Sequence, residues 1–291
     1  MISELFNIIS PVFIIALIGY IWIKGGYDFP TDFVTRINMY IGAPCLAFTG
    51  IMKLGDGLLE VTDFLLATLL SIMLLMAISG LFAYIFKLPV RSYITSLYST
   101  NSGNMGIPLC LFAFGERGMS LAIAYFSISA LFQFTVALFI SHGSLSASSL
   151  TRVTMLYGIG AALFFIIGDI EAPKWLMNST TLMGGVTIPL MLLTLGASLA
   201  GLKLKNSGKM VLISAFKMAM GFGIGLGIAT LFGFTGEERT VLILQSSMPV
   251  AIFSYLLASK YNRHPDDVAS MIFITTLMSF VTVPLLLTYL M

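Results

Sequence analysis

Two carboxamide side chains, Asn101 and Asn104, lie in the middle of residues 92–115, a stretch of 24 residues without a charged side chain. A transmembrane helix needs about 20 such residues. Gly103 and Pro108 weaken a helix here, and broken helix at membrane depth persists only where protein or a water-lined cavity covers it. Carboxamides both donate and accept hydrogen bonds, so they can orient a ligand. The stretch therefore predicts a ligand-binding site inside a membrane.

A second set of residues with the same spacing follows in the second half of the chain. Gln245 stands four residues before Pro249, as Asn104 stands four residues before Pro108. Proline interrupts a helix, so half-helices starting near the two prolines would direct their partial positive charge at the breaks. Such ends favour an anionic group such as a carboxylate. The predicted substrate-binding residues are Asn101, Gly103, Asn104, Pro108, Gln245, Ser247, Pro249 and Lys217.

Lys217 is the only basic residue well inside an apolar span. Its long side chain could extend to the cytoplasmic interface, in which case Lys217 would have no functional role. Gly221 and Gly225 follow on the same helical face, and Gly223 with Gly227 adds a neighbouring ridge of small residues that predicts helix–helix contact. On a protein-facing side, an intramembrane charge is usually functional. It could neutralise an anionic substrate or act as an internal cation in place of a coupling ion.

The elements that position these residues are predicted to be membrane helices. The chain is 58% hydrophobic and 10% charged, with a mean hydropathy of +0.98, which is far outside the range of soluble proteins. The predicted spans are residues 5–23, 33–52, 63–86, 92–114, 118–140, 152–168, 175–201, 209–232, 240–259 and 267–290.

The charges between the spans predict the orientation. With both termini outside, ten Lys and Arg residues fall on the cytoplasmic side and four outside. The prediction is a multi-pass protein of the cell (inner) membrane, with lipid as its surroundings. Five spans per half then give an inverted repeat, a common plan of transporters. Pro44 and Pro189 occupy matching kinks in the second and seventh spans, and residues 141–149 form the linker between the repeats.

Several classes of function lack the necessary residues. No acidic side chain lies in the central part of a span, which disfavours a carboxylate-based antiporter or an aspartyl protease. His142 and His264 fall in loops, so neither a metal site nor Ser–His catalysis is predicted. Cys45 and Cys110 are predicted to be small apolar residues of the spans. The chain is predicted not to be an enzyme and to bind no cofactor and, with a net charge of +2, no nucleic acid.

Residues 101–108 with Leu109, and residues 188–199 of the seventh span, resemble signatures of the auxin efflux carrier family, which includes plant PIN proteins and many bacterial permeases. The resemblance covers essentially the whole chain, and the short linker is similar to that of bacterial members. It implies an all-α polytopic fold with crossed, broken fourth and ninth spans, as in bile-acid symporters and sodium–proton antiporters. It also implies a scaffold and a mobile transport unit. The corresponding segments are scaffold 1–60 and 150–205, transport unit 61–140 and 206–291, and linker 141–149.

The resulting functional hypothesis is a secondary carrier for a small organic anion, a mono- or dicarboxylate, that works by elevator-type alternating access. The family's substrates, auxin and malate-like dicarboxylates, are organic anions. Coupling to H+, Na+ or membrane potential stays open, and a scaffold-mediated homodimer is plausible for this fold. The alternatives are a sodium-coupled symporter of the bile-acid type and a membrane sensor that binds a ligand without transporting it.

Overall fold

A computed structural model describes residues 2–54, 61–137, 139–140, 154–202 and 208–290 of the chain. The described residues form helices and short connections, with one isolated β-bridge. The first half contains α1 (Ile2–Lys24), α2 (Thr31–Ile37), the π-helical turn η1 (Asn38–Gly42), α3 (Ala43–Leu54), α4 (Val61–Ile85), α5 (Val90–Tyr98), η3 (Ser102–Gly106), α6 (Ile107–Phe132) and η4 (Gln133–Ala137). The second half contains α8 (Met155–Ile167), α9 (Lys174–Gly201), α10 (Gly208–Leu231), α11 (Gly236–Ser246), α12 (Ile252–Lys260) and α13 (Pro265–Leu290). The predicted linker, residues 141–149, lies outside the described residues.

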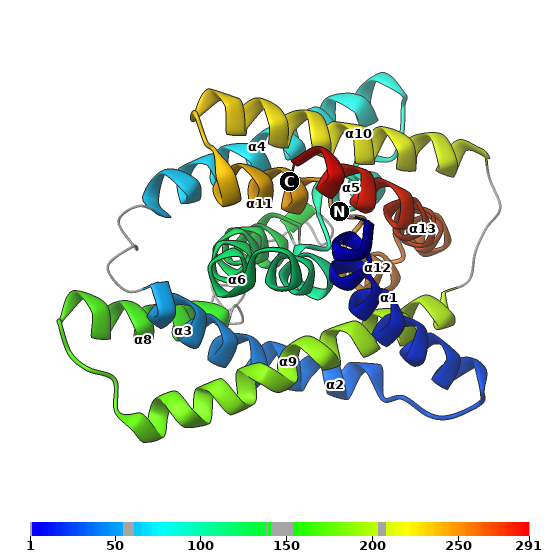
Figure 1. Cartoon of the computed structure of the whole chain (residues 1–291). Coiled ribbons are helices and arrows are strands. Elements are labelled where there is room, and N and C mark those ends of the chain that lie inside the picture. Colours follow the sequence, from blue (N-terminus) through cyan, green and yellow to red (C-terminus); the bar gives the residue numbers. More distant parts are fainter. Residues whose placement is uncertain (1, 55–60, 138, 141–153, 203–207, 291) are drawn as a thin grey trace.

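The helices form two groups with α6 between them (Figure 1). In the first group α9 packs against α1 and α3, and α8 packs against α3. In the second group α10 packs against α4, α11 and α13, and α12 packs against α13. The elements α6 and η3 contact both groups, through α3, α1 and α9 on one side and α4 and α11 on the other. The cores of the two groups therefore meet around the segment that contains Asn101 and Asn104.

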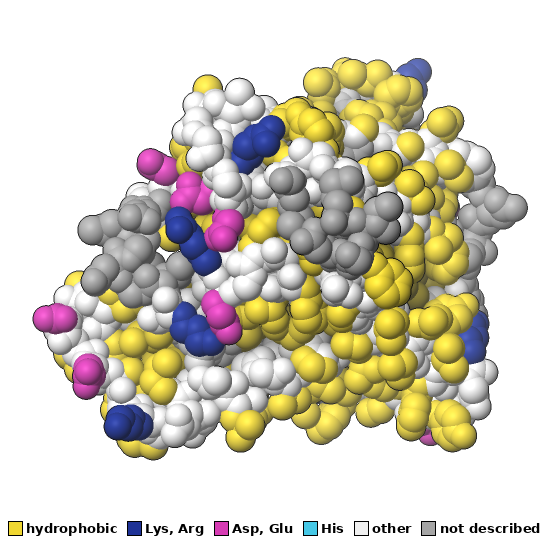
Figure 2. Space-filling view, viewed as in Figure 1, with side chains coloured by type: hydrophobic (Ala, Val, Ile, Leu, Met, Phe, Trp, Pro, Cys, Tyr) yellow, Lys and Arg dark blue, Asp and Glu magenta, His cyan; other side chains and the backbone are white. Residues whose placement is uncertain are grey.

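The surface is that of a protein that crosses a membrane several times. Among the described residues, six helical segments are long and apolar enough to span a bilayer, and α8 is a shorter apolar helix. Figure 2 shows a broad hydrophobic surface on one face of the molecule, with Lys, Arg, Asp and Glu side chains gathered mainly near one edge. A soluble monomer rarely exposes so much contiguous apolar surface. The prediction of an all-helical, multi-pass membrane protein is confirmed at this level.

The segment predicted as the fourth span is broken, but not where the prolines and glycines suggested. Helix α5 ends at Tyr98, and the chain is extended at Ser99 before η3 begins at Ser102. Pro108 lies in the first turn of α6, a position where the missing N–H costs no helical hydrogen bond. The break therefore precedes the Gly–Pro sequence. Gly115, with φ 63°, then turns the chain within α6 between the predicted fourth and fifth spans.

The segment predicted as the ninth span is broken as well. Helix α11 ends at Ser246, α12 begins at Ile252, and Pro249 lies between them. The predicted second span is formed by α2, η1 and α3, with Pro44 directly after the π-helical turn. In contrast, α9 continues through Pro189 as one helix.

Candidate functional site

The two breaks lie side by side and bond to each other through their backbones. The Asn101 N–H donates to the Pro249 carbonyl at 2.7 Å, and the Ala251 N–H donates to the Ser99 carbonyl at 3.1 Å. Thr100 and Val250 form the antiparallel bridge between these bonds. These two segments, residues 99–101 and 249–251, thus satisfy polar groups that would be costly to leave unpaired inside a membrane protein.

A side chain of α13 supports this crossing. The Val250 N–H donates to the hydroxyl oxygen of Thr275 at 3.1 Å, and the same hydroxyl donates to the Met271 carbonyl at 2.7 Å. The two interrupted helices and α13 therefore form one hydrogen-bonded unit in the middle of the second helix group.

A cavity of about 120 Å³ lies beside the crossing, between the two helix groups. This is smaller than the roughly 300–1,000 Å³ of sites for drug-sized ligands, so the space suits a small molecule. The first group contributes α2, η1 and α9, the second contributes α12, and η3 and η4 belong to the central segment with α6. Its polar lining residues are Thr31, Asp32, Thr35, Asn38, Thr100, Asn101, Asn104, Gln133, Thr194 and Ser198.

Three polar atoms in this lining are buried without a hydrogen-bond partner. They are Asn38 Oδ1, Asn101 Nδ2 and Thr194 Oγ1, and each of the three residues is 5% exposed. An unsatisfied buried donor or acceptor costs about 1–3 kcal/mol, so native proteins contain few of them. Three around a single cavity are the arrangement expected of a site that is completed by a polar ligand.

Two helix starts also face the cavity. Asn101, Gly103 and Asn104 precede or begin the turn that leads into α6, and Ala251 and Ile252 cap and begin α12. The first N–H groups of a helix have no helical partner and carry a partial positive charge. The cavity can therefore accept an anionic group near the crossing and hydrogen bonds from the surrounding amides.

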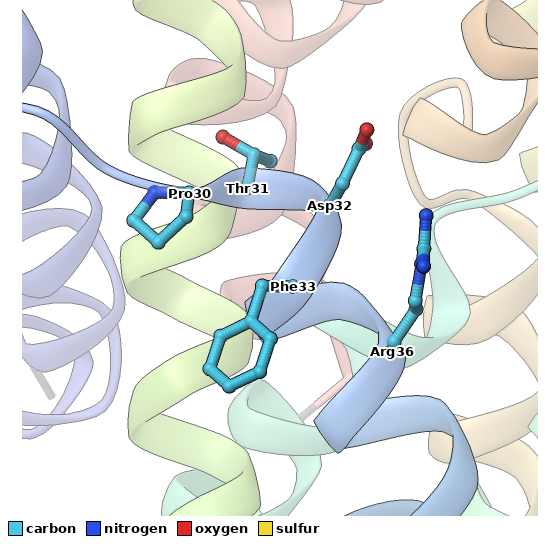
Figure 3. A pocket seen from close by; sticks show the side chains of 5 residues that line it. All are labelled: Pro30, Thr31, Asp32, Phe33 and Arg36. Atoms are coloured by element: carbon cyan, nitrogen blue, oxygen red, sulfur yellow. The ribbon is translucent and has the colours of Figure 1, made fainter.

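The mouth of the cavity carries charge from α2. Thr31 and Asp32 line both the inner cavity and an adjoining open hollow of about 520 Å³, to which Arg36 also contributes. Asp32 and Arg36 are exposed and project from α2 toward the same side, whereas Phe33 points away from them (Figure 3). This open hollow therefore carries a carboxylate and a guanidinium one helical turn apart.

The structure separates the predicted site residues into two sets. Asn101, Gly103 and Asn104 line the cavity, and Pro108, Gln245, Ser247, Pro249 and Lys217 do not. Gln245 is fully buried and packs between the broken helices: its Nε2 donates to Cys110 Sγ at 3.7 Å, and its Oε1 has no partner. The Ser247 hydroxyl donates to the Ile243 carbonyl at 2.7 Å and so belongs to the end of α11.

Lys217 lies on α10, next to the end of α11, and is not among the residues of this lining. Its side chain is fully buried, and its Nζ donates a hydrogen bond to the carbonyl of Met248. Of the two interpretations that the sequence left open for Lys217, extension to the interface does not fit this burial. Direct contact with a ligand in the cavity is also not found, because Lys217 is not part of the lining.

The glycines of α10 divide into two faces, only one of which is in helix contact. A Cβ on Gly221 would lie 2.3 Å from the Ser246 carbonyl oxygen, and one on Gly225 would lie 2.9 Å from Ile243 Cα. Gly223 and Gly227 are exposed, with nothing within 4 Å of the Cβ position. The prediction that they form a second contact ridge is wrong, since they are turned away from α11.

The cavity is also lined by four residues that the sequence did not indicate, Asp32, Asn38, Gln133 and Thr194. A signal existed for two of them, because Asn38 and Gln133 are carboxamides inside predicted apolar spans. Asn178 is also a carboxamide inside such a span, but it is exposed. Residue type alone therefore could not separate the cavity residues from those on the surface.

The fold and the site are those of a membrane protein that binds a small ligand. The features that define this class are several long apolar helices, paired helix breaks and a polar cavity between two helix groups. The profile of the family described as "Membrane transport protein" matches residues 5–154 and 152–287, nearly the full length. The chain belongs to this family, which confirms the resemblance to the auxin efflux carriers.

Two archaeal proteins described as uncharacterized transporters are similar to the chain. The protein of Methanothermobacter thermautotrophicus is 26% identical over 293 residues, covering 95% of each chain. The protein MJ1031 of Methanocaldococcus jannaschii is 26% identical over 300 residues, covering 96% of each chain. The protein is thus a member of a family of membrane transporters.

Proposed function

We propose that the protein is a secondary transporter for a small organic anion, which it binds in the cavity beside the crossing of the two broken helices. The observation that carries this proposal is the composition of the cavity wall. The starts of α12 and of the turn leading into α6 line it together with unpaired polar atoms of Asn38, Asn101 and Thr194. Partial positive charge and free hydrogen-bonding groups at one place match a carboxylate.

The transport step follows from the position of the cavity between the helix groups. One wall belongs to α2, η1 and α9, and the other belongs to η3, η4 and α12. In an elevator-type mechanism the second group slides along the first and carries the bound anion with the crossing. The extensive packing inside each group favours such a movement of whole groups over local opening of single helices.

On the side away from the cavity mouth, the helix groups touch through α3 and α6. The Ser120 hydroxyl donates to the Gly50 carbonyl at 2.9 Å, and Lys53 Nζ lies 3.0 Å from Glu116 Oε1. With the predicted orientation, these contacts are external and Asp32 is cytoplasmic. In the proposed cycle this structure is the inward-open state, and the α3–α6 contacts separate when the cavity opens outward.

The site is tested with Asn101→Ala and a matched control, Asn178→Ala, which removes the same group from an exposed position of α9. A thermal-shift screen of mono- and dicarboxylates on the purified protein identifies a ligand. Asn101→Ala should then lower its affinity about tenfold or more, because a hydrogen bond to a charged group contributes about 1.5–3 kcal/mol. The control should bind like the wild type. Unchanged affinity in Asn101→Ala contradicts the proposed site.

Transport itself is tested by counterflow in proteoliposomes loaded with the same carboxylate. Saturable exchange of labelled ligand, lost in Asn101→Ala and kept in Asn178→Ala, supports a carrier. Saturable binding without exchange by the reconstituted wild type would favour the membrane sensor instead.

A further inference from the structure

Among the residues that the structure describes, Lys217 is the one buried basic side chain, and the proposed site does not use it. It sits near the middle of α10, is 0% exposed, and donates to the Met248 carbonyl just beyond the end of α11. Removing an ammonium group from water costs several kcal/mol unless polar partners replace the water. A charge kept at such a place has a role that an apolar side chain could not fill.

The partner of this ammonium group is a backbone carbonyl, that of Met248, and not a carboxylate. Helix α10 packs against α4, α11 and α13, whose acidic residues lie in their first turns. These residues are Asp63, Glu237, Glu238, Asp266 and Asp267. Among the described residues, no carboxylate forms an ion pair with Lys217. The counter-charge is instead the partial negative charge at the carbonyl end of a broken helix.

The local packing is built to bring this lysine to the break. Lys217, Gly221 and Gly225 follow at steps of four residues on one face of α10, and the two glycines let the backbones of α10 and α11 approach closely. Ser214, one turn earlier, is fully buried and its hydroxyl has no partner. The ammonium group thus donates to a carbonyl oxygen, a ligand that a hard monovalent cation would also take.

We propose that the ammonium group of Lys217 is a built-in cation, which occupies the place at the α11 break that a soluble coupling cation would otherwise fill. Broken membrane helices commonly use the carbonyls of their C-terminal ends to coordinate such ions. Here the amine is covalently attached, so it occupies the break without having to bind from solution. The protein therefore requires no sodium ion at this position.

The test measures the melting temperature of the purified protein in sodium, potassium and choline chloride at equal ionic strength. The wild type should melt at the same temperature in all three salts. Lys217→Ala should melt at a lower temperature and should recover on addition of ethylammonium or propylammonium ions, which fit the space left by the side chain. Lys209→Ala, which removes an exposed lysine from the same helix, should show neither effect.

A second variant separates charge from volume. Lys217→Met keeps most of the stem without the charge, so it should be destabilised like Lys217→Ala, whereas a lysine that only fills space predicts a Met variant close to the wild type. Sodium-dependent melting of the wild type would overturn the proposal, and so would a stable Lys217→Met. This readout needs no substrate, so its failure would leave the proposed anion site standing.

Discussion

Exchanging glycine for alanine at position 221 should damage the crossing, whereas the same exchange two residues later should not. An added Cβ at Gly221 would lie 2.3 Å from the Ser246 carbonyl oxygen and 3.2 Å from Ser247 Cα. Both contacts are with backbone, which cannot move aside by a change of rotamer. At Gly223 the added Cβ meets nothing within 4 Å. Both substitutions otherwise make the same change within one helix.

Two effects of opposite sign change the free energy of unfolding. Inserting a methyl group into a packed contact costs about 1–3 kcal/mol, since α10 and α11 must separate by about 1 Å to restore ordinary contact. Replacing an unconstrained helical glycine by alanine stabilises by about 0.5–1 kcal/mol. Because the gain from alanine is common to both variants, they should differ by the steric cost alone, about 1–3 kcal/mol in stability, or roughly 2–12 °C in melting temperature.

The assay is thermal unfolding in detergent, followed by intrinsic fluorescence, for Gly221→Ala, Gly223→Ala and the wild type. Gly221→Ala should melt below the wild type and Gly223→Ala at or above it. Separation of α10 from α11 should also pull Lys217 from the Met248 carbonyl, so Gly221→Ala should resemble Lys217→Ala in its reduced stability. Equal melting temperatures for the two glycine variants would refute the close contact and, with it, the described geometry of the crossing.

Three further variants test the cavity and the contacts around it. Thr194→Val removes a buried hydroxyl without a partner, so the variant should melt at or above the wild-type temperature, with a free energy of unfolding higher by up to about 1 kcal/mol. It should bind the anion more weakly in calorimetry. A destabilised variant with full affinity would contradict this. Asp32→Asn removes a carboxylate from the mouth and should raise the affinity for dicarboxylates, by at most about fivefold, more than for monocarboxylates, since the interaction of two charges near water is about 1 kcal/mol; equal changes for both ligands would argue against it. Glu116→Gln breaks an exposed ion pair with Lys53 and should change the unfolding free energy by less than about 1 kcal/mol; a larger loss in chemical denaturation would show a stronger contact between α3 and α6.

The sequence by itself determined the class of protein. Hydrophobic composition fixed an all-helical membrane protein, because only structures that satisfy their own backbone can cross lipid. Two short motifs indicated which spans are interrupted. They are the glycines, proline and asparagines of residues 101–108, and Gln245 with Pro249. Together with the seventh-span signature they also identified the family, which the full-length match confirms. Composition and short motifs depend only on residues that are close in the sequence, so they can be recognised without the structure.

Only the tertiary structure decided which polar residues share a cavity. The position of the first break, at Ser99–Asn101, depends on backbone pairing with Pro249 and Ala251, residues about 150 positions away in the chain. Asn38 and Thr194 join Asn101 because α9 packs against both η1 and η3, and no spacing in the sequence encodes these contacts. Gln245 and Lys217 carry suitable chemistry but face the α11 side of the crossing. The direction in which a polar side chain points from a membrane helix is set by its neighbours, so residue type predicted the chemistry and packing selected the site.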